Sequence, residues 1–260
     1  MPVYRTDKWI EKSYHSPKYI YKKLTKFFHE GNVKDITNLL IHHGMYHKPE
    51  NDGELLLESL RKKNVWEIIE KEEIKLKREW NGQNVSIFIL PSDSYNRKIR
   101  EHYNGRSGLA FPDKLFIFLS SESTVEEIKA LFTHEYNHCC RLIHDPTKEK
   151  DYTLLNRIIL EGLAENAVRE RFGTSPLAPW TTYYTNDELQ DLWEQVVLPH
   201  KDLSKNTRNA SAILYGKSFY PNMVGYAVGY YLVKHYMKQT GKRSKDLLKL
   251  PAEKIAFIDE

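Results

Sequence analysis

The sequence of 260 residues lacks several features that mark particular classes of protein. It has only two cysteines, Cys139 and Cys140, which are neighbours in the chain. We expect them to lie in a helix, where they point in different directions, so a disulfide framework is excluded. No stretch approaches the roughly 18 consecutive apolar residues of a membrane span, and the amino terminus, MPVYRTDKWIEK, has no apolar run typical of a secretory signal. These features predict a cytoplasmic protein with no membrane span.

A strong excess of one charge is also lacking. The formal net charge is +4, and acidic and basic residues alternate along most of the chain. A dedicated nucleic-acid surface would need clustered basic residues, so we expect no nucleic-acid partner. Hydrophobic residues make up 40% of the chain, which is too many for a disordered protein and ordinary for a globular one.

The order of predicted elements indicates an α+β fold. Residues up to about 80 have helical patterns, and NGQ at 81–83 ends the last of them. Two short segments rich in β-branched and aromatic residues follow and predict strands, separated by a loop that contains Gly105 and Gly108. From Ser123 onward the chain is again mostly helical. The predicted helices are 18–30, 32–44 and 52–80, the predicted strands are 85–91 and 114–120, and the predicted regions are 1–82 and 83–260.

The segment STVEEIKALFTHEYNHCCRLIHD carries the clearest chemical motif. Ser123 and Glu126 have capping-box spacing, which predicts a helix that begins near Thr124. Inside it, His134 and His138 of an H-E-x-x-H motif lie one turn apart on one side of the helix. Two imidazoles at that spacing can bind one zinc ion. The neighbouring Glu135 can then take a proton from water as a general base.

Two other interpretations of this helix are open. The two histidines lie along one edge of an apolar stripe, where they could simply form hydrogen bonds at the rim of a core. Alternatively, His144 has the spacing of the third ligand in the metzincin pattern H-E-x-x-H-x-x-G-x-x-H. That pattern needs glycine at the position of Arg141, however, because the helix must end there. We therefore expect the helix to continue past Arg141 and to carry His144 away from the metal.

The next helix, DYTLLNRIILEGLAENAVRERFG, supplies candidate acidic ligands. Asp151 is its expected N-cap, and Gly173 is its expected end. Glu161 and Glu165 fall one turn apart in the middle of its apolar stripe, where an ionised carboxylate is costly without a cation or strong donors. We interpret Glu161 as the third zinc ligand and Glu165 as the acceptor that orients His134. A buried salt bridge to Arg157 or Arg141 is the alternative.

Two further details concern helix packing and the reaction. Gly162 would allow the two motif-bearing helices to approach closely. A zinc peptidase also needs a donor for the developing oxyanion. Tyrosine phenols and the ring of His235 are candidates, and Tyr226 is our first choice. Tyr226 belongs to a helix in which Gly225 and Gly229 give a face of close approach. Because the chain has 17 tyrosines, packing is the competing explanation for Tyr226.

H-E-x-x-H followed by a helix with E-x-x-x-[DE] resembles the gluzincin, or thermolysin-clan, metallopeptidases. The segments LFTHEYNHCCR and ILEGLAENAV are similar to those of a family of predicted zinc-dependent proteases from Gram-positive bacteria (YjaZ-like). The resemblance covers about 84–240. It implies a zincin-like domain over 83–260, with a small sheet over the active-site helix and a mostly helical C-terminal half. It also implies that the stretch from Gly108 to Phe111 lies near the cleft. The residues expected to bind substrate backbone are Gly108, Leu109 and Ala110.

These observations predict a zinc-dependent peptidase that acts on a peptide or protein substrate, with Zn²⁺ as its cofactor. The alternative is a non-proteolytic regulatory or peptide-binding module that retains zinc for structure or sensing. A structural zinc site is usually closed by four protein ligands, whereas a catalytic site leaves one position open. The three predicted ligands and the adjacent Glu135 favour catalysis.

Overall fold

The computed structural model describes residues 2–49, 53–97, 99–100 and 105–258. The chain forms two compact units, an N-terminal unit (Met1–Cys139) and a C-terminal unit (Cys140–Glu260). The division falls inside helix α7 (Val125–His144), which carries the H-E-x-x-H motif. The predicted domain boundary after residue 82 is a different division of the chain, and it stays a prediction.

A three-stranded sheet forms the centre of the N-terminal unit. The strand order is β1(Ser86–Pro91), β3(Lys114–Leu119), β2(Ser107–Ala110), with β1 parallel and β2 antiparallel to β3. Both predicted strands are confirmed, as β1 and β3. Every residue of β3 and nearly every residue of β1 is buried. The prediction of a loop around Gly108 was wrong, because β2 occupies that position. Its four residues include a glycine, which gives too weak a pattern to predict a strand.

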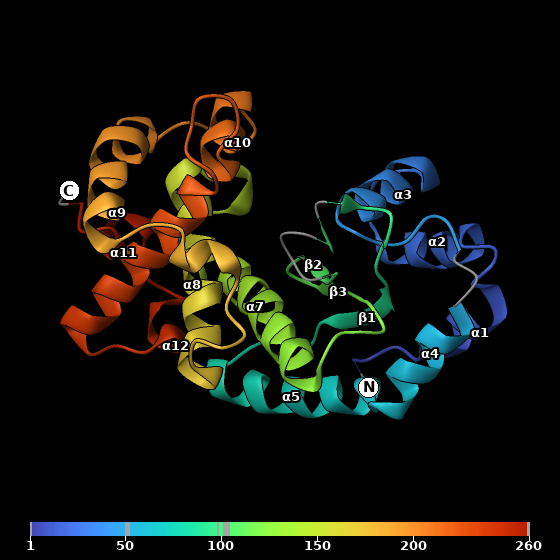
Figure 1. The fold of residues 1–260 in the computed structure, drawn as a ribbon. Helices are drawn as coiled ribbons and strands as arrows, with labels where there is room; N and C mark the ends of the chain where they lie inside the picture. The colour runs from blue at the N-terminus through green and yellow to red at the C-terminus, as the bar shows by residue number, and fades with distance from the viewer. Residues whose placement is uncertain (1, 50–52, 98, 101–104, 259–260) are drawn as a thin grey trace. The chain divides into compact units, whose positions relative to one another are not determined.

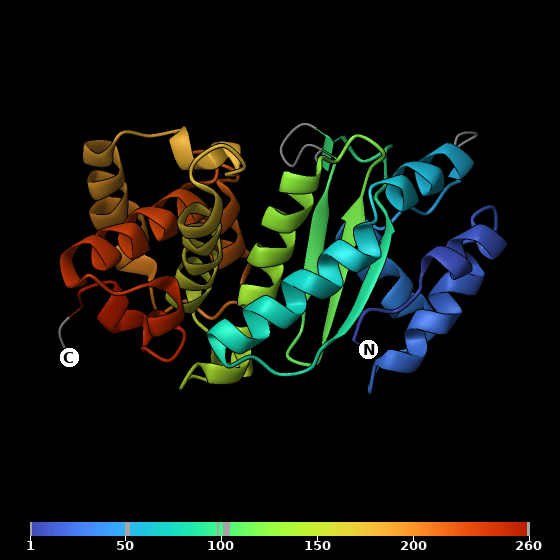
Figure 2. The same ribbon diagram turned by 90° about the horizontal axis from the view of Figure 1, so that it is seen from below.

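The two faces of this sheet contact different helices (Figure 2). The N-terminal helices are α1(Asp7–Ser13), α2(Lys18–Leu24), η1(Thr25–Phe27) and α3(Val33–His42). Phe27 meets the sheet through Phe88, with ring centroids 4.6 Å apart. The first part of α7 covers the opposite face. Helix α5(Val65–Trp80) packs along α7, where the ring centroids of Trp80 in α5 and Tyr136 in α7 are 6.1 Å apart.

The N-terminal helices differ in detail from the sequence prediction. The predicted run from 52 to 80 is two helices, α4(Gly53–Lys62) and α5. They are separated at Asn64, which has a left-handed backbone conformation with a φ of 54°. Asparagine is one of the few non-glycine residues that adopt this conformation readily, and it interrupts a helix without breaking the apolar pattern. Asn81, with a φ of 51°, ends α5 as predicted from NGQ.

The C-terminal unit is helical, which together with the sheet confirms the α+β class. Its longest helices, α8(Leu154–Phe172) and α11(Val224–Thr240), pack side by side (Figure 1). A Cβ atom on Gly162 would lie 2.2 Å from the carbonyl oxygen of Gly229. Gly162 therefore permits close approach to α11, which corrects the prediction that its partner is the motif helix. The other segments are η2(Glu149–Asp151), η3(Pro179–Thr182), α9(Asn186–Leu192), η4(Trp193–Val197), η5(Leu198–His200), α10(Arg208–Tyr215), α12(Ser244–Leu247) and α13(Ala252–Ile255).

The starts of the two motif-bearing helices were predicted with an error in the capping residue. Thr124 and Glu127 form the reciprocal pair at the start of α7, since Thr124 N donates to Glu127 Oε2 at 3.0 Å and Glu127 N donates to Thr124 Oγ1 at 3.2 Å. The predicted pair lay one residue earlier. Thr153, and not Asp151, precedes α8, and Gly173 ends it as predicted. Adjacent candidate caps are hard to separate by spacing alone.

Among the described residues, no helix combines the length and the apolar character that crossing a membrane requires.

Candidate metal centre

Helix α7 positions the two histidines of the motif. Because they are four residues apart, His134 and His138 project from the same side of the helix. Their ring centroids are 4.7 Å apart, and the ring planes are nearly perpendicular at 88°. His138 is buried, with 8% of its surface exposed. The helix therefore places the two imidazole rings close to each other on one side.

Helix α8 supplies the third member of the group. One ligand atom from each of His134, His138 and Glu161 lies within 4.8 Å of the other two. Two imidazoles and one carboxylate are a donor set that zinc accepts, and three protein ligands leave a fourth position of a tetrahedral site for water or substrate. The three residues selected from the sequence could thus hold a metal ion together.

His144 is not a member of this group. Helix α7 continues without interruption through Arg141 and ends at His144, as predicted. A residue six positions further along a continuous helix lies about 9 Å further along its axis, at about 1.5 Å per residue. The backbone turn that a metzincin needs at this position is absent from the described helix. The arrangement supports Glu161 over His144 as the third ligand.

Glu135 packs directly against strand β2. It is 8% exposed, and a Cβ atom added to Gly108 would lie 2.4 Å from both its Cγ and its Cδ. The candidate general base and the strand predicted to bind substrate are therefore neighbours. All four residues of β2 are partly exposed, and in the part of the sheet that the structure describes this strand pairs only with β3.

Glu165 has a partner that the sequence did not reveal. The side chain is 4% exposed, and its Oε1 accepts a hydrogen bond from Ala178 N at 2.7 Å. Ala178 directly precedes η3, so Glu165 attaches this segment to α8. No pattern in the sequence around Pro179 indicated this contact. The predicted hydrogen bond between Glu165 and His134 stays a prediction.

The arginines considered as alternative partners of the two glutamates have other contacts. Arg141 pairs with Asp145, with Nε 2.8 Å from Oδ2. The Arg157 guanidinium lies 6.0 Å from the ring centroid of Tyr215. Arg141 and Arg157 thus have partners other than Glu161 and Glu165.

Tyr226 lies in a cluster of aromatic side chains. It is 8% exposed, and its ring centroid is 5.3 Å from that of Trp180 and 5.7 Å from that of Tyr215. Tyr230 also contacts Trp180, at 6.3 Å, and burial raises the pKa of its phenol above the ordinary value. This packing agrees with the competing explanation for the tyrosine stripe. The role of Tyr226 as an oxyanion donor stays a prediction.

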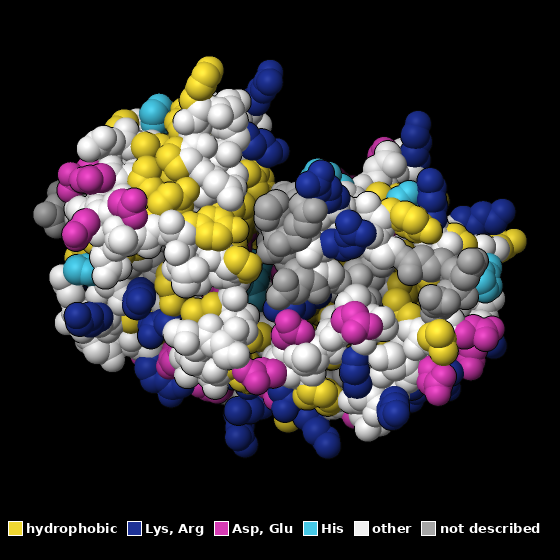
Figure 3. Space-filling view, viewed as in Figure 1, with side chains coloured by type: hydrophobic (Ala, Val, Ile, Leu, Met, Phe, Trp, Pro, Cys, Tyr) yellow, Lys and Arg dark blue, Asp and Glu magenta, His cyan; other side chains and the backbone are white. Residues whose placement is uncertain are grey.

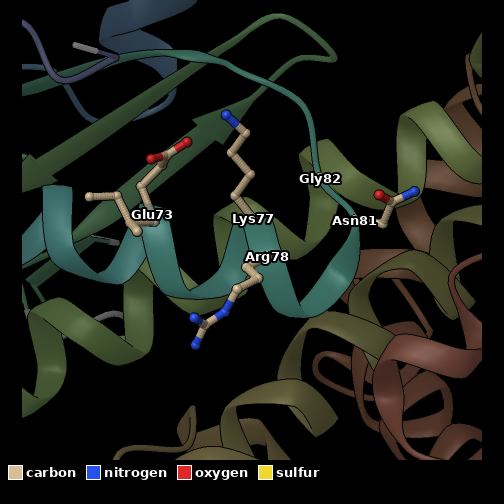
Figure 4. A pocket seen from close by; sticks show the side chains of 6 residues that line it. Glu73, Lys77, Arg78, Asn81 and Gly82 are labelled. Carbon is tan, nitrogen blue, oxygen red and sulfur yellow. The ribbon is translucent and has the colours of Figure 1, made fainter.

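A separate pocket lies along α5 (Figure 4). Glu73 and Lys77 stand on one side of the helix there, while Arg78 points away from them. Glu73 is 2% exposed, and burial raises the pKa of its carboxyl group. The residues that line the pocket include no histidine, cysteine or hydroxyl nucleophile. They are Glu73, Ile74, Lys77, Arg78, Asn81 and Gly82.

One face of the molecule shows how its surface charges are distributed. On the face in Figure 3, acidic and basic side chains are interspersed over both units. Hydrophobic side chains also reach the surface, among them the fully exposed Phe219 and the partly exposed Tyr183. This face shows no continuous basic stripe of the kind that tracks a nucleic-acid backbone.

Comparisons with known proteins support the sequence resemblance. The model of the family described as "Predicted Zn-dependent protease (DUF2268)" matches residues 65–257. "Uncharacterized protein YjaZ" of Bacillus subtilis (strain 168) is 46% identical over 228 residues, which cover 88% of this chain and 86% of that protein. "Uncharacterized protein YjfC" of the same organism is 26% identical over 195 residues, which cover 72% of this chain and 63% of that protein. No solved structure matches this chain.

Proposed function

Since the chain belongs to the family of predicted Zn-dependent proteases, we propose that it is a zinc-dependent peptidase of the gluzincin type with a zincin-like fold. The observation that carries this proposal is the group formed by His134, His138 and Glu161, whose ligand atoms lie within 4.8 Å of one another. In this proposal the three side chains bind the metal, and Glu165 orients His134 through the ring nitrogen that does not face the metal.

A zinc ion held by these residues would supply a Lewis acid that polarises the scissile carbonyl and lowers the pKa of the attacking water. The protein supplies the proton transfers. Glu135 follows His134 directly in the motif, and its carboxylate accepts the proton of the attacking water. The same carboxyl group then returns that proton to the leaving amine. Tyr226 is the proposed donor to the oxyanion that forms between these two steps.

The substrate is proposed to be an extended peptide that lies along β2. Among the described residues of the sheet, this strand pairs with β3 on one side only, and we propose that its outer edge accepts another strand. Gly108, Leu109 and Ala110 would then bind substrate through backbone hydrogen bonds. Such contacts recognise an extended backbone and leave the choice of side chains to the pockets around it.

The alternative, a zinc-containing module without peptidase activity, is less well supported. Three protein ligands leave a coordination position open, which is characteristic of catalytic zinc sites. The motif also provides a carboxylate next to the ligands, which a purely structural site does not need. As a related proposal, a chain whose two cysteines are buried neighbours in one helix fits a cytoplasmic location.

The test is cleavage of a diverse peptide library by the zinc-loaded protein, analysed by mass spectrometry. We expect discrete cleavage sites that disappear in the variant Glu135→Gln, while that variant retains about the zinc content of the parent. Gln is nearly isosteric with Glu but cannot accept the proton. Equal cleavage by the parent and by Glu135→Gln would contradict the proposal, as would loss of zinc from Glu135→Gln.

A further inference from the structure

We infer that Gly108 is a positioning residue for Glu135: the missing side chain at 108 leaves the space in which the Glu135 carboxylate is held against β2. This inference rests on the proposed function for its kinetic consequence. The packing relation between the two residues stands independently of it. Gly108 would thereby act on catalysis through Glu135, in addition to the substrate contact proposed for its backbone.

The position of Gly108 in the sheet explains why its side chain would point at α7. In the antiparallel pair, Gly108 is opposite Ile117 and Leu109 is opposite Phe116. Phe116 faces the N-terminal helices, because its ring centroid lies 5.8 Å from that of Phe28. Successive residues of a strand point to opposite faces, so a side chain at 108 would project to the face that α7 covers.

The available space excludes even a methyl group there. A Cβ atom on Gly108 would lie 2.4 Å from Glu135 Cγ and Cδ and 2.6 Å from Oε1. Carbon atoms in contact are normally about 3.5–4.0 Å apart. An added Cβ would therefore overlap with Glu135, whose side chain occupies the space beside the Gly108 backbone. The glycine is not required by the backbone, since its φ lies outside the left-handed range. Its requirement comes from the side chain that it faces.

The consequence of adding a methyl group follows from the flexibility of glutamate. Glu135 is unbranched and can turn to another rotamer, so Gly108→Ala should displace the carboxylate more than it unfolds the protein. A general base must lie within hydrogen-bonding reach of the proton that it takes. A displacement of about 1 Å in an active site can reduce the rate about a hundredfold.

The first measurement needs no activity. Crystal structures of the zinc-loaded parent and of Gly108→Ala should show the Glu135 carboxylate displaced in the variant, with the same zinc content in both proteins. An unchanged Glu135 position would overturn the inference. If the carboxylate is displaced but neither protein cleaves any peptide, the packing relation is upheld and the proposed function is contradicted.

The second measurement separates positioning from substrate binding. We expect kcat of Gly108→Ala to fall about a hundredfold with KM nearly unchanged. The same substitution should change the residual rate of Glu135→Ala little, because that variant lacks the Cγ and Cδ atoms that the added methyl group would meet. A higher KM at the parent's kcat, or an equal fold loss in both backgrounds, would overturn the inference.

A matched control comes from another crowded glycine of the same unit. A Cβ atom on Gly53 would lie 1.9 Å from the ring of Tyr14, and this ring is buried and cannot swing aside like a glutamate side chain. Gly53→Ala should therefore lower the thermal midpoint and leave kcat of the folded protein unchanged. If Gly53→Ala lowered kcat as much as Gly108→Ala, the effect at 108 would be general and the inference would be wrong.

Discussion

Arg141 and Asp145 form a buried ion pair one turn apart at the end of α7, with Nε 2.8 Å from Oδ2 and 1% of each side chain exposed. Burial lowers the pKa of the Arg141 guanidinium from its ordinary value, and the negative charge of Asp145 opposes this change. Arg141 Nη1 also donates to three backbone carbonyl oxygens, those of Leu247, Leu248 and Leu250. The residue that stands where a metzincin has glycine thus fastens the helix end to the C-terminal segment.

The first prediction concerns the stability of this pair. Arg141→Met should lower the free energy of unfolding by about 3–5 kcal/mol, because it leaves the Asp145 carboxylate buried without its cation. Urea unfolding of the metal-free protein measures this change. The double variant Arg141→Met/Asp145→Asn should recover part of the loss, since it removes the buried charge. A double variant that loses as much as the sum of the single ones would contradict this account.

The second prediction concerns the dependence of stability on pH. Burial of Glu170 favours its protonated form, but hydrogen bonds from Ser244 and Arg243 outweigh this and lower the pKa of Glu170 from its ordinary value of 4.5. Ser244 Oγ donates to Glu170 Oε2 at 2.6 Å. A group with a lowered pKa in the folded state stabilises the protein above its unfolded pKa, and that stability is lost as the pH falls through its folded pKa.

The contribution of Glu170 can be isolated by comparison with Glu170→Gln. Unfolding of both metal-free proteins should be followed in urea from neutral pH to below pH 4.5, the ordinary pKa of this group. We expect the parent to be more stable at neutral pH and the two proteins to converge as the pH falls below that value. A stability difference that stays constant over this range would show that Glu170 has no such role.

The sequence predicted the α+β class and the two strongly apolar strands because each rests on a pattern of neighbouring residues. The same holds for the continuation of α7 through Arg141, where the absence of glycine was informative. Contacts between distant segments were less accessible. Nothing near Glu165 indicated its hydrogen bond to Ala178 N, and nothing near Gly162 distinguished α11 from α7 as its neighbour.

Glu165 is the subject of the third prediction. Glu165→Gln keeps an oxygen that can accept from Ala178 N but removes the charge that would hold the ring of His134. Zinc affinity should therefore fall about ten- to a hundredfold, as measured by competition with a chelator. The near-ultraviolet circular dichroism of the protein, to which the buried Trp180 contributes, should change little. Parent-like zinc affinity in Glu165→Gln would show that Glu165 does not orient His134 in the metal site.

The last prediction is that Glu161, and not His144, completes the metal site with His134 and His138. The structure groups one ligand atom of Glu161 with those of the two histidines within 4.8 Å, whereas α7 carries His144 onward in a continuous helix. We expect His144→Ala to bind about one equivalent of zinc like the parent, while Glu161→Ala and His138→Ala lose most of it. Elemental analysis after dialysis against a weak chelator measures the content, and circular dichroism checks that each variant is folded. Loss of zinc from His144→Ala with retention in Glu161→Ala would place the chain among proteins with a third histidine ligand. It would also remove the metal-binding reason proposed for the position of Glu161 in the apolar stripe of α8, where a carboxylate is costly unless a cation or donors meet it.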